Sequence, residues 1–94
     1  MSEEHSTYSI ALSSAADRQL RRLPRDILAR VRGAIDALAR EPRPSGVVKL
    51  SGVSHEGTPL YRVRVGDYRV VYAIQDEQLV VLIVAVGDRK EVYR

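Results

Sequence analysis

Three consecutive strand-like segments in the second half of the chain constrain the fold most. Leu60–Val65 alternates between two faces, Tyr68–Ile74 is rich in β-branched and aromatic residues, and Leu79–Val86 is almost wholly apolar. Gly66-Asp67 and Gln75–Gln78 form the short turns between them, with the glycine supplying a positive φ. We therefore expect a meander whose last strand is central and buried on both faces.

The first half of the chain predicts one strand and two helices. Tyr8–Leu12 has β character, and Ser13-Ser14 offers N-caps for a helix over Ala15–Arg22. Pro24 ends that helix and suits the first turn of the next, over Pro24–Arg40. The apolar residues of this second helix recur every three or four positions, as one buried stripe: Ile27, Leu28, Val31, Ala34, Ile35 and Leu38.

The predicted element order is β-α-α-β-β-β, which is an α+β fold. A helical hairpin should pack on one face of a small, mainly antiparallel, twisted sheet. A length of 94 residues favours a single domain, which we place over 8–94, after a flexible N-terminal tail over 1–7. Ser45–Pro59 is expected to be a long loop with a functional or mobile role. The charged residues Gly87–Arg94 are expected to leave the sheet.

Composition excludes several classes of site. The chain has no Cys, and His5 and His55 are isolated from any carboxylate cluster, so we expect neither a disulfide nor a metal or other cofactor. The longest apolar run, Leu79–Val86, falls far short of the roughly 20 residues of a membrane span. Met1–Thr7 lacks the apolar core of a signal peptide, so a cytoplasmic location is expected.

The basic residues are almost all arginines. The chain has 15 Lys and Arg against 12 Asp and Glu, which gives a net charge of +3, and the only lysines are Lys49 and Lys90. Arginine is suited to bidentate contacts with phosphate and to stacking on bases. The composition is therefore a weak indication of a phosphate-bearing partner.

Several arginines are predicted to converge on the sheet face opposite the helices. If Val63 and its alternate neighbours face the core, Arg62 and Arg64 point outward together, and Arg69 can lie across from them. Arg89 and Tyr93 follow the end of the last strand. Guanidinium groups aimed at a phosphate would stabilise the transition state when a 2′-OH attacks it. The alternative without a function is that these arginines are ordinary solvated surface residues. Residue chemistry alone therefore indicates only a face that could bind an anionic ligand.

Four segments together resemble the toxins of the RelE/ParE superfamily. The segment from Tyr61 to Tyr72 matches a basic strand, a glycine-containing turn and a Tyr-Arg-hydrophobic-hydrophobic-Tyr pattern. Gly87–Tyr93 resembles the closing segment of the family, Lys49–Gly52 its Lys-Leu-x-Gly loop, and Leu20–Pro24 its Leu-x-x-Leu-Pro helix junction. The resemblance covers nearly the whole chain after Thr7.

The resemblance implies a role for each matching residue. Arg62 and Arg64 would bind substrate and assist activation of the 2′-OH, while Arg69 would hold the scissile phosphate. Arg89 would stabilise charge or protonate the leaving oxygen, and Tyr93 would stack on a base or aid proton transfer. Three further cations are candidates for RNA binding: Lys49, Lys90 and Arg94.

The general base stays open at this point. Arginine remains protonated at any ordinary pH and is a poor base. Tyr93, Glu91 or His55 would then take the proton, or deprotonation would be assisted only electrostatically.

The resemblance implies the toxin of a type II toxin–antitoxin system. The favoured activity is ribosome-dependent endoribonucleolytic cleavage of mRNA in the A site. The expected partners of this activity are the ribosome and mRNA. The alternatives are a ParE-like toxin that binds and inhibits DNA gyrase, and an inactive corepressor. Arg69, Arg89 and Tyr93 together favour the nuclease. Either toxin implies a cognate antitoxin that is acidic and folds on binding. The toxin would contact operator DNA only indirectly, through this antitoxin.

Overall fold

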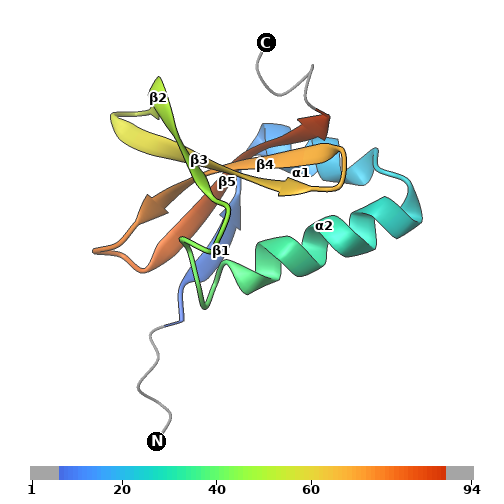
Figure 1. The fold of residues 1–94 in the computed structure, drawn as a ribbon, viewed down its shortest axis with the longest axis horizontal. Coiled ribbons are helices and arrows are strands. Elements are labelled where there is room, and N and C mark those ends of the chain that lie inside the picture. Colours follow the sequence, from blue (N-terminus) through green and yellow to red (C-terminus); the bar gives the residue numbers. More distant parts are fainter. Residues whose placement is uncertain (1–6, 89–94) are drawn as a thin grey trace, which may run out of the picture.

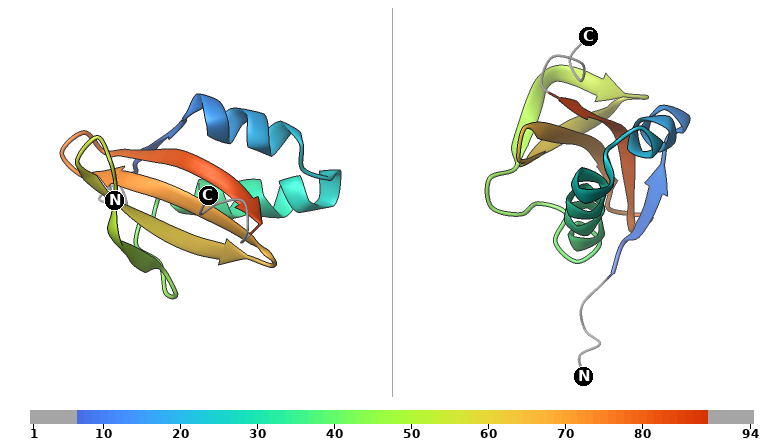
Figure 2. Two further views of the ribbon diagram at one scale, coloured as in Figure 1. Left: turned by 90° about the horizontal axis from the view of Figure 1, so that it is seen from above. Right: turned by 90° about the vertical axis from the view of Figure 1, so that its right-hand side faces the viewer.

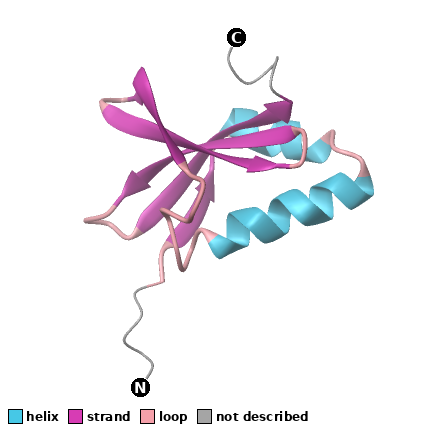
Figure 3. Cartoon of the chain, in the orientation of Figure 1, coloured by secondary structure: helices cyan, strands magenta, loops and turns pink. Residues whose placement is uncertain are grey.

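Two helices pack on one face of a single five-stranded sheet (Figures 1 and 3). The computed structural model describes residues 7–88. The strand order is β1-β5-β4-β3-β2, and every neighbouring pair is antiparallel except β1 with β5. This confirms an α+β fold with a helical hairpin on a mainly antiparallel sheet. The elements are β1 (Ser9–Leu12), α1 (Ser14–Arg21), α2 (Arg25–Ala37), β2 (Val48–His55), β3 (Thr58–Val65), β4 (Tyr68–Gln75) and β5 (Val80–Asp88).

The helices begin within one residue of the predicted positions, and α2 ends earlier than predicted. The Ser13 hydroxyl accepts a hydrogen bond from the Ala16 amide at 3.0 Å, which caps α1, and donates to the Val84 carbonyl at 2.8 Å, which ties the cap to β5. Pro24 is the N-cap of α2, and the helix ends at Ala37 rather than at residue 40. In residues 7–88, no helix is long and apolar enough to cross a membrane.

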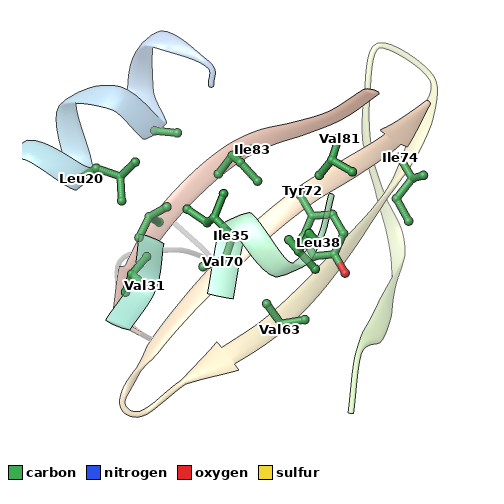
Figure 4. Close-up of a cluster of buried hydrophobic side chains, with 12 residues drawn as sticks. Leu20, Val31, Ile35, Leu38, Val63, Val70, Tyr72, Ile74, Val81 and Ile83 are labelled. Carbon is green, nitrogen blue, oxygen red and sulfur yellow. The ribbon is translucent and has the colours of Figure 1, made fainter. Parts of the chain in front are cut away.

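The main core lies between the helices and the sheet (Figure 4). Val31 and Ile35 of α2, with Leu38 directly after its end, pack there against alternate residues of β3, β4 and β5. The predicted stripe of α2 is therefore confirmed. The prediction that the last strand is the central one, buried on both faces, is wrong in part. β5 lies inside the sheet between β1 and β4, but β4 is the middle strand and is buried on both faces, whereas alternate residues of β5 are half-buried. The buried residues of this core are Ala16, Leu20, Val31, Ile35, Leu38, Val63, Val70, Tyr72, Ile74, Val81, Ile83 and Val86.

The loop predicted over Ser45–Pro59 is wrong, because most of it is the edge strand β2 paired with β3. Most β2 side chains are exposed, so burial imposes no alternating pattern on its sequence. The pairing is also irregular between Lys49 and Ser54. The hairpin closes on Glu56 and Gly57, whose φ angles are 52° and 85°.

The prediction that the chain leaves the sheet at Gly87 is also wrong. Gly87 and Asp88 continue β5 and pair with Arg69 and Tyr68 of β4. Neither residue favours a strand by itself. The length of β5 is set by the partner strand β4, which offers hydrogen bonds along its whole length.

A polar network ties three distant segments together at the end of the sheet where β4 turns into β5. Asp76 accepts a hydrogen bond from the Tyr8 hydroxyl at 2.7 Å and bonds from the Arg43 guanidinium at 2.9 and 3.3 Å. The Arg43 guanidinium also lies 5.5 Å from the centre of the Tyr61 ring. The network attaches the chain before β1 and the connection after α2 to the sheet.

The Asp76 network predicts a pH-dependent contribution to stability. Hydrogen bonds from Arg43 and Tyr8 lower the pKa of Asp76. A lowered pKa in the folded state stabilises above the unfolded value, and this stability is lost as the pH falls through the folded value. Asp76→Asn should therefore lower the Tm at neutral pH, and the difference from wild type should shrink below about pH 4. Thermal unfolding followed by circular dichroism measures this.

Glu77→Gln is the matched control, because this exposed residue lies in the same turn. It should leave the Tm close to wild type throughout. A deficit in Asp76→Asn that is equally large at acid and neutral pH would contradict the ionic origin of the effect.

Candidate functional site

Arg62, Arg64 and Arg69 lie on the sheet face turned away from the helices, which we call the open face. The alternate residues Val63 and Val70 belong to the core on the other side. Arg64 pairs directly with Arg69 across β3 and β4, and side chains of paired residues share a face. Figure 2 shows both helices on one side of the sheet, which leaves the open face uncovered by them. The predicted convergence of these three arginines is confirmed.

The site stands beside the turn between β3 and β4. Val65 pairs with Tyr68, so Gly66 and Asp67 alone connect the two strands. Gly66 has a φ of 63°, in the left-handed region that glycine adopts without a Cβ penalty. The turn brings Arg64 and Arg69 into direct register, because each lies two positions outside the connecting residues.

Arg69 is buried although it belongs to the open face. Only 7% of its surface is exposed. Its two cross-strand neighbours are Arg64 and Gly87, and the glycine has no side chain to compete for space. Arg64, by contrast, is exposed, and Arg62 is half-buried. The site therefore combines a sunken guanidinium with an exposed one.

Two donors at this site lack an acceptor within the described part of the chain. The Nε atoms of Arg62 and Arg69 are buried and make no hydrogen bond. Buried polar atoms are nearly always paired, and a buried charge without compensation is costly. The ion pairs found among residues 7–88 engage Arg21, Arg43 and His55, and none of the three arginines of the open face. An anion bound here would supply the missing acceptors.

The other half of the open face is apolar. Leu60, Val71 and Ala73 form a small second core, with Leu50 of β2 packed against it. Val71 pairs directly with Arg62. The arginines thus stand at the border of an apolar patch, where local water is reduced and charge interactions are strengthened.

A pocket of about 590 Å³ opens between the end of α2 and β3. Ala37, Leu38 and Pro44 contribute an apolar wall, while Arg62 and Arg64 form part of the rim. β2 pairs with β3 only as far as Arg62, so the edge of β3 is uncovered beyond that point. The complete lining is Ala34, Ala37, Leu38, Glu41, Pro44, Ser45, Gly46, Val48, Arg62, Val63 and Arg64.

The structure separates two candidates from the arginines. Lys49 pairs with Tyr61, whose ring contacts the main core, so the register places Lys49 on the helix side of the sheet. His55 pairs with Thr58 at the far end of β3. At about 3.3 Å per residue, roughly 20 Å lie between Thr58 and Arg64. His55 is therefore too distant to act as the base beside Arg64.

The remaining candidates lie outside the described residues. They are Arg89, Lys90, Glu91, Tyr93 and Arg94. Their sequence-based roles stay predictions. Within residues 7–88, no group of three or more His, Cys, Asp or Glu side chains is arranged to hold a metal ion.

Sequence reasoning missed the contribution of α2 to this end of the sheet. The position that a Cβ atom at Gly66 would occupy lies 3.1 Å from Nη2 of Arg30. Arg30 is exposed, and its helical position does not reveal a neighbour 36 positions away. No sequence signal indicates this contact, because it depends on how α2 packs against the sheet.

Comparison with known proteins defines the class. Residues 10–93 match the family described as ParE toxin of type II toxin–antitoxin systems. The chain belongs to this family. Its relatives are of the RelE type: it is 35% identical to toxin RelG of Mycobacterium tuberculosis, over 93% of this chain and 97% of that protein. It is 36% identical to toxin RelE of the same organism, over 100% and 93%.

Solved structures give the same result for the fold. The RelE–RelB complex of Pyrococcus horikoshii superposes with a TM-score of 0.75 and 32% identity, over 90% of this chain and 98% of that one. The toxin–antitoxin complex RelBE2 of Mycobacterium tuberculosis superposes with a TM-score of 0.72 and 34% identity, over 88% and 99%. The chain is thus a type II toxin of the RelE branch of the RelE/ParE superfamily.

Proposed function

We propose that this toxin is a ribosome-dependent endoribonuclease that cleaves mRNA in the A site. The observation that carries the proposal concerns the buried Nε donors of Arg62 and Arg69, which share the open face and have no acceptor among residues 7–88. A phosphate placed between them would accept both hydrogen bonds and neutralise the buried charge of Arg69. The kinship with RelE toxins supports the same conclusion.

The reaction needs no group beyond the substrate and side chains. The 2′-oxygen attacks the adjacent phosphorus, the bond from phosphorus to the 5′-oxygen breaks, and a 2′,3′-cyclic phosphate and a 5′-OH result. Arg69 and Arg62 would stabilise the negative charge that builds on the non-bridging oxygens. The 2′-OH proton leaves to a base, and a second proton reaches the 5′-oxygen. Tyr93, Glu91 and Arg89 remain the candidates for these transfers.

The ribosome would contribute orientation. The open face carries few groups that could fix a flexible strand with its 2′-OH in line with the leaving oxygen. Positioning of this kind is worth many orders of magnitude in rate. We therefore expect cleavage on programmed ribosomes and little on free RNA.

Primer extension on an mRNA translated in vitro tests the proposal. Purified wild-type protein should produce new stops within A-site codons. Intact mRNA on actively translating ribosomes would overturn the nuclease assignment. Inhibition of gyrase supercoiling by the same protein would then establish the ParE-like alternative, and inactivity in both assays would leave the corepressor.

An antitoxin is the proposed protein partner. Structural relatives of this chain are seen in complex with the antitoxin RelB. The pocket between α2 and β3 suits an apolar side chain of such a partner, because its wall is apolar. Acidic residues beside that anchor would meet Arg62 and Arg64 on the rim. A partner segment that continued from the pocket around the uncovered edge of β3 would also cover part of the open face, and this would neutralise the toxin.

Ala37→Arg should weaken antitoxin binding at least tenfold, because the long side chain would occupy the pocket. Ala37 is exposed, so the fold should tolerate the change. Isothermal titration with the cognate antitoxin measures the Kd. Ala29→Arg is the control, since this exposed alanine of α2 does not line the pocket. Equal affinities for both variants would exclude the pocket as the docking site.

A further inference from the structure

Arg30 of α2 reaches the turn between β3 and β4 from the helix side. Its Nη2 lies 3.1 Å from the position of a Cβ at Gly66, so the guanidinium rests against the backbone of the turn. Figure 1 shows this turn above α2. The glycine at the tip leaves the guanidinium uncovered by a side chain there.

The charges around this turn are unbalanced. Arg64 and Arg69 flank it on the open face and Arg30 lies on the helix side, while two acidic residues are near, Asp67 within the turn and Asp88 paired with Tyr68 beside it. Arg30 is exposed and takes part in none of the ion pairs found among residues 7–88. Guanidinium groups thus line both sides of one hairpin tip. This arrangement suits a polyanion that crosses from one side to the other.

We propose that Arg30 binds a phosphate of the substrate RNA where the strand leaves the open face and passes around the turn between β3 and β4. The inference rests on the proposed function, which places the scissile phosphate beside Arg69. Arg30 then extends the RNA path onto the helical layer. It acts as a binding residue for a flanking nucleotide and takes no part in the chemical step.

The neighbouring Arg32 provides a matched comparison. It lies on the same helix, but it lines a hollow with Ile10 and Leu12, beside β1. Arg32 is exposed like Arg30 and has the same charge. Replacing either residue with alanine therefore changes the net charge of the protein equally, and only Arg30→Ala removes a cation from the turn.

The salt dependence of RNA binding tests the proposal. The probe is a short single-stranded RNA with 2′-O-methyl groups, which cannot be cleaved by its own 2′-oxygen. One phosphate contact with a single strand contributes about 0.7 to the slope of log K against log salt concentration. Arg30→Ala should reduce the slope by about this amount and weaken binding several-fold at low salt. Arg32→Ala should leave the slope unchanged, and both variants should keep the wild-type Tm.

Each other outcome has a definite meaning. A slope that Arg69→Ala reduces and Arg30→Ala does not would overturn this inference while the proposed function stands. If Arg30→Ala changes the salt dependence only of binding to ribosomes that carry no mRNA, the phosphate belongs to ribosomal RNA, and the proposed path of the substrate RNA is overturned. If the wild-type protein binds neither the strand nor ribosomes, the proposed function itself fails. A lower Tm with an unchanged slope would make Arg30 a purely structural cover of the turn.

Discussion

Replacing Arg69 with alanine should slow cleavage of ribosome-bound mRNA by roughly 10²–10³-fold, the loss typical of removing one preorganised donor from a developing oxyanion. Arg69 is 7% exposed and has a buried Nε without an acceptor among the described residues. The side chain is therefore already largely removed from water before substrate arrives, so its interaction with the phosphate requires little further desolvation of the arginine. Single-turnover cleavage on programmed ribosomes measures the rate.

Two further variants separate charge from packing. Arg69→Met keeps an apolar chain in the space that the arginine stem fills, and it should be as slow as Arg69→Ala. Arg18→Ala removes an exposed arginine on α1 and should cleave at the wild-type rate. Cleavage by both Arg69 variants within threefold of wild type would remove this residue from the catalytic site. Circular dichroism spectra would show that the variants are folded.

Replacing Tyr72 with alanine should lower the free energy of unfolding by about 3–5 kcal/mol, as expected for truncation of a fully buried aromatic side chain. Tyr72 has no exposed surface and lies between α2 and the sheet. Its hydroxyl donates a 2.7 Å hydrogen bond to the carbonyl of Pro42, which follows α2. Tyr72→Phe keeps the ring and leaves that carbonyl unpaired, so it should cost only about 1–3 kcal/mol.

Urea unfolding at neutral pH measures both values for Tyr72. A loss in Tyr72→Phe as large as in Tyr72→Ala would show that the hydrogen bond, rather than the packing of the ring, dominates. Burial raises the pKa of Tyr72. A raised folded pKa adds stability that is complete below the unfolded value and is lost as the pH rises through the folded one. Wild-type stability should therefore decline above about pH 10, and less so in Tyr72→Phe.

Elements with a repeating pattern could be predicted from the sequence. The apolar stripe of the second helix, which ends at Leu38, is buried as expected, because a helix with one apolar face must place that face against a core. The alternation along β3 placed Val63 inward and Arg62 and Arg64 outward, because successive strand residues point to opposite faces. The glycine turn then determined the pairing of Arg64 with Arg69.

The edge strand β2 could not be predicted in the same way. Its side chains are mostly exposed, so no hydrophobic period distinguishes it from a loop. It is a strand because β3 presents an unpaired edge to it, and that edge exists only in the assembled sheet. The extension of β5 through Gly87 and Asp88 has the same origin in β4.

The sequence by itself determined the helical hairpin, the meander and the set of arginines on the open face, since each follows from local periodicity and turn chemistry. Tertiary structure alone decided that Arg69 is sunken while Arg64 is exposed, that His55 lies far from both, and that Arg30 meets Gly66. Burial depth and contacts between distant segments depend on which strands flank a residue and how the layers pack. The local sequence pattern therefore predicts neither the burial depth of a residue nor its contacts with distant segments.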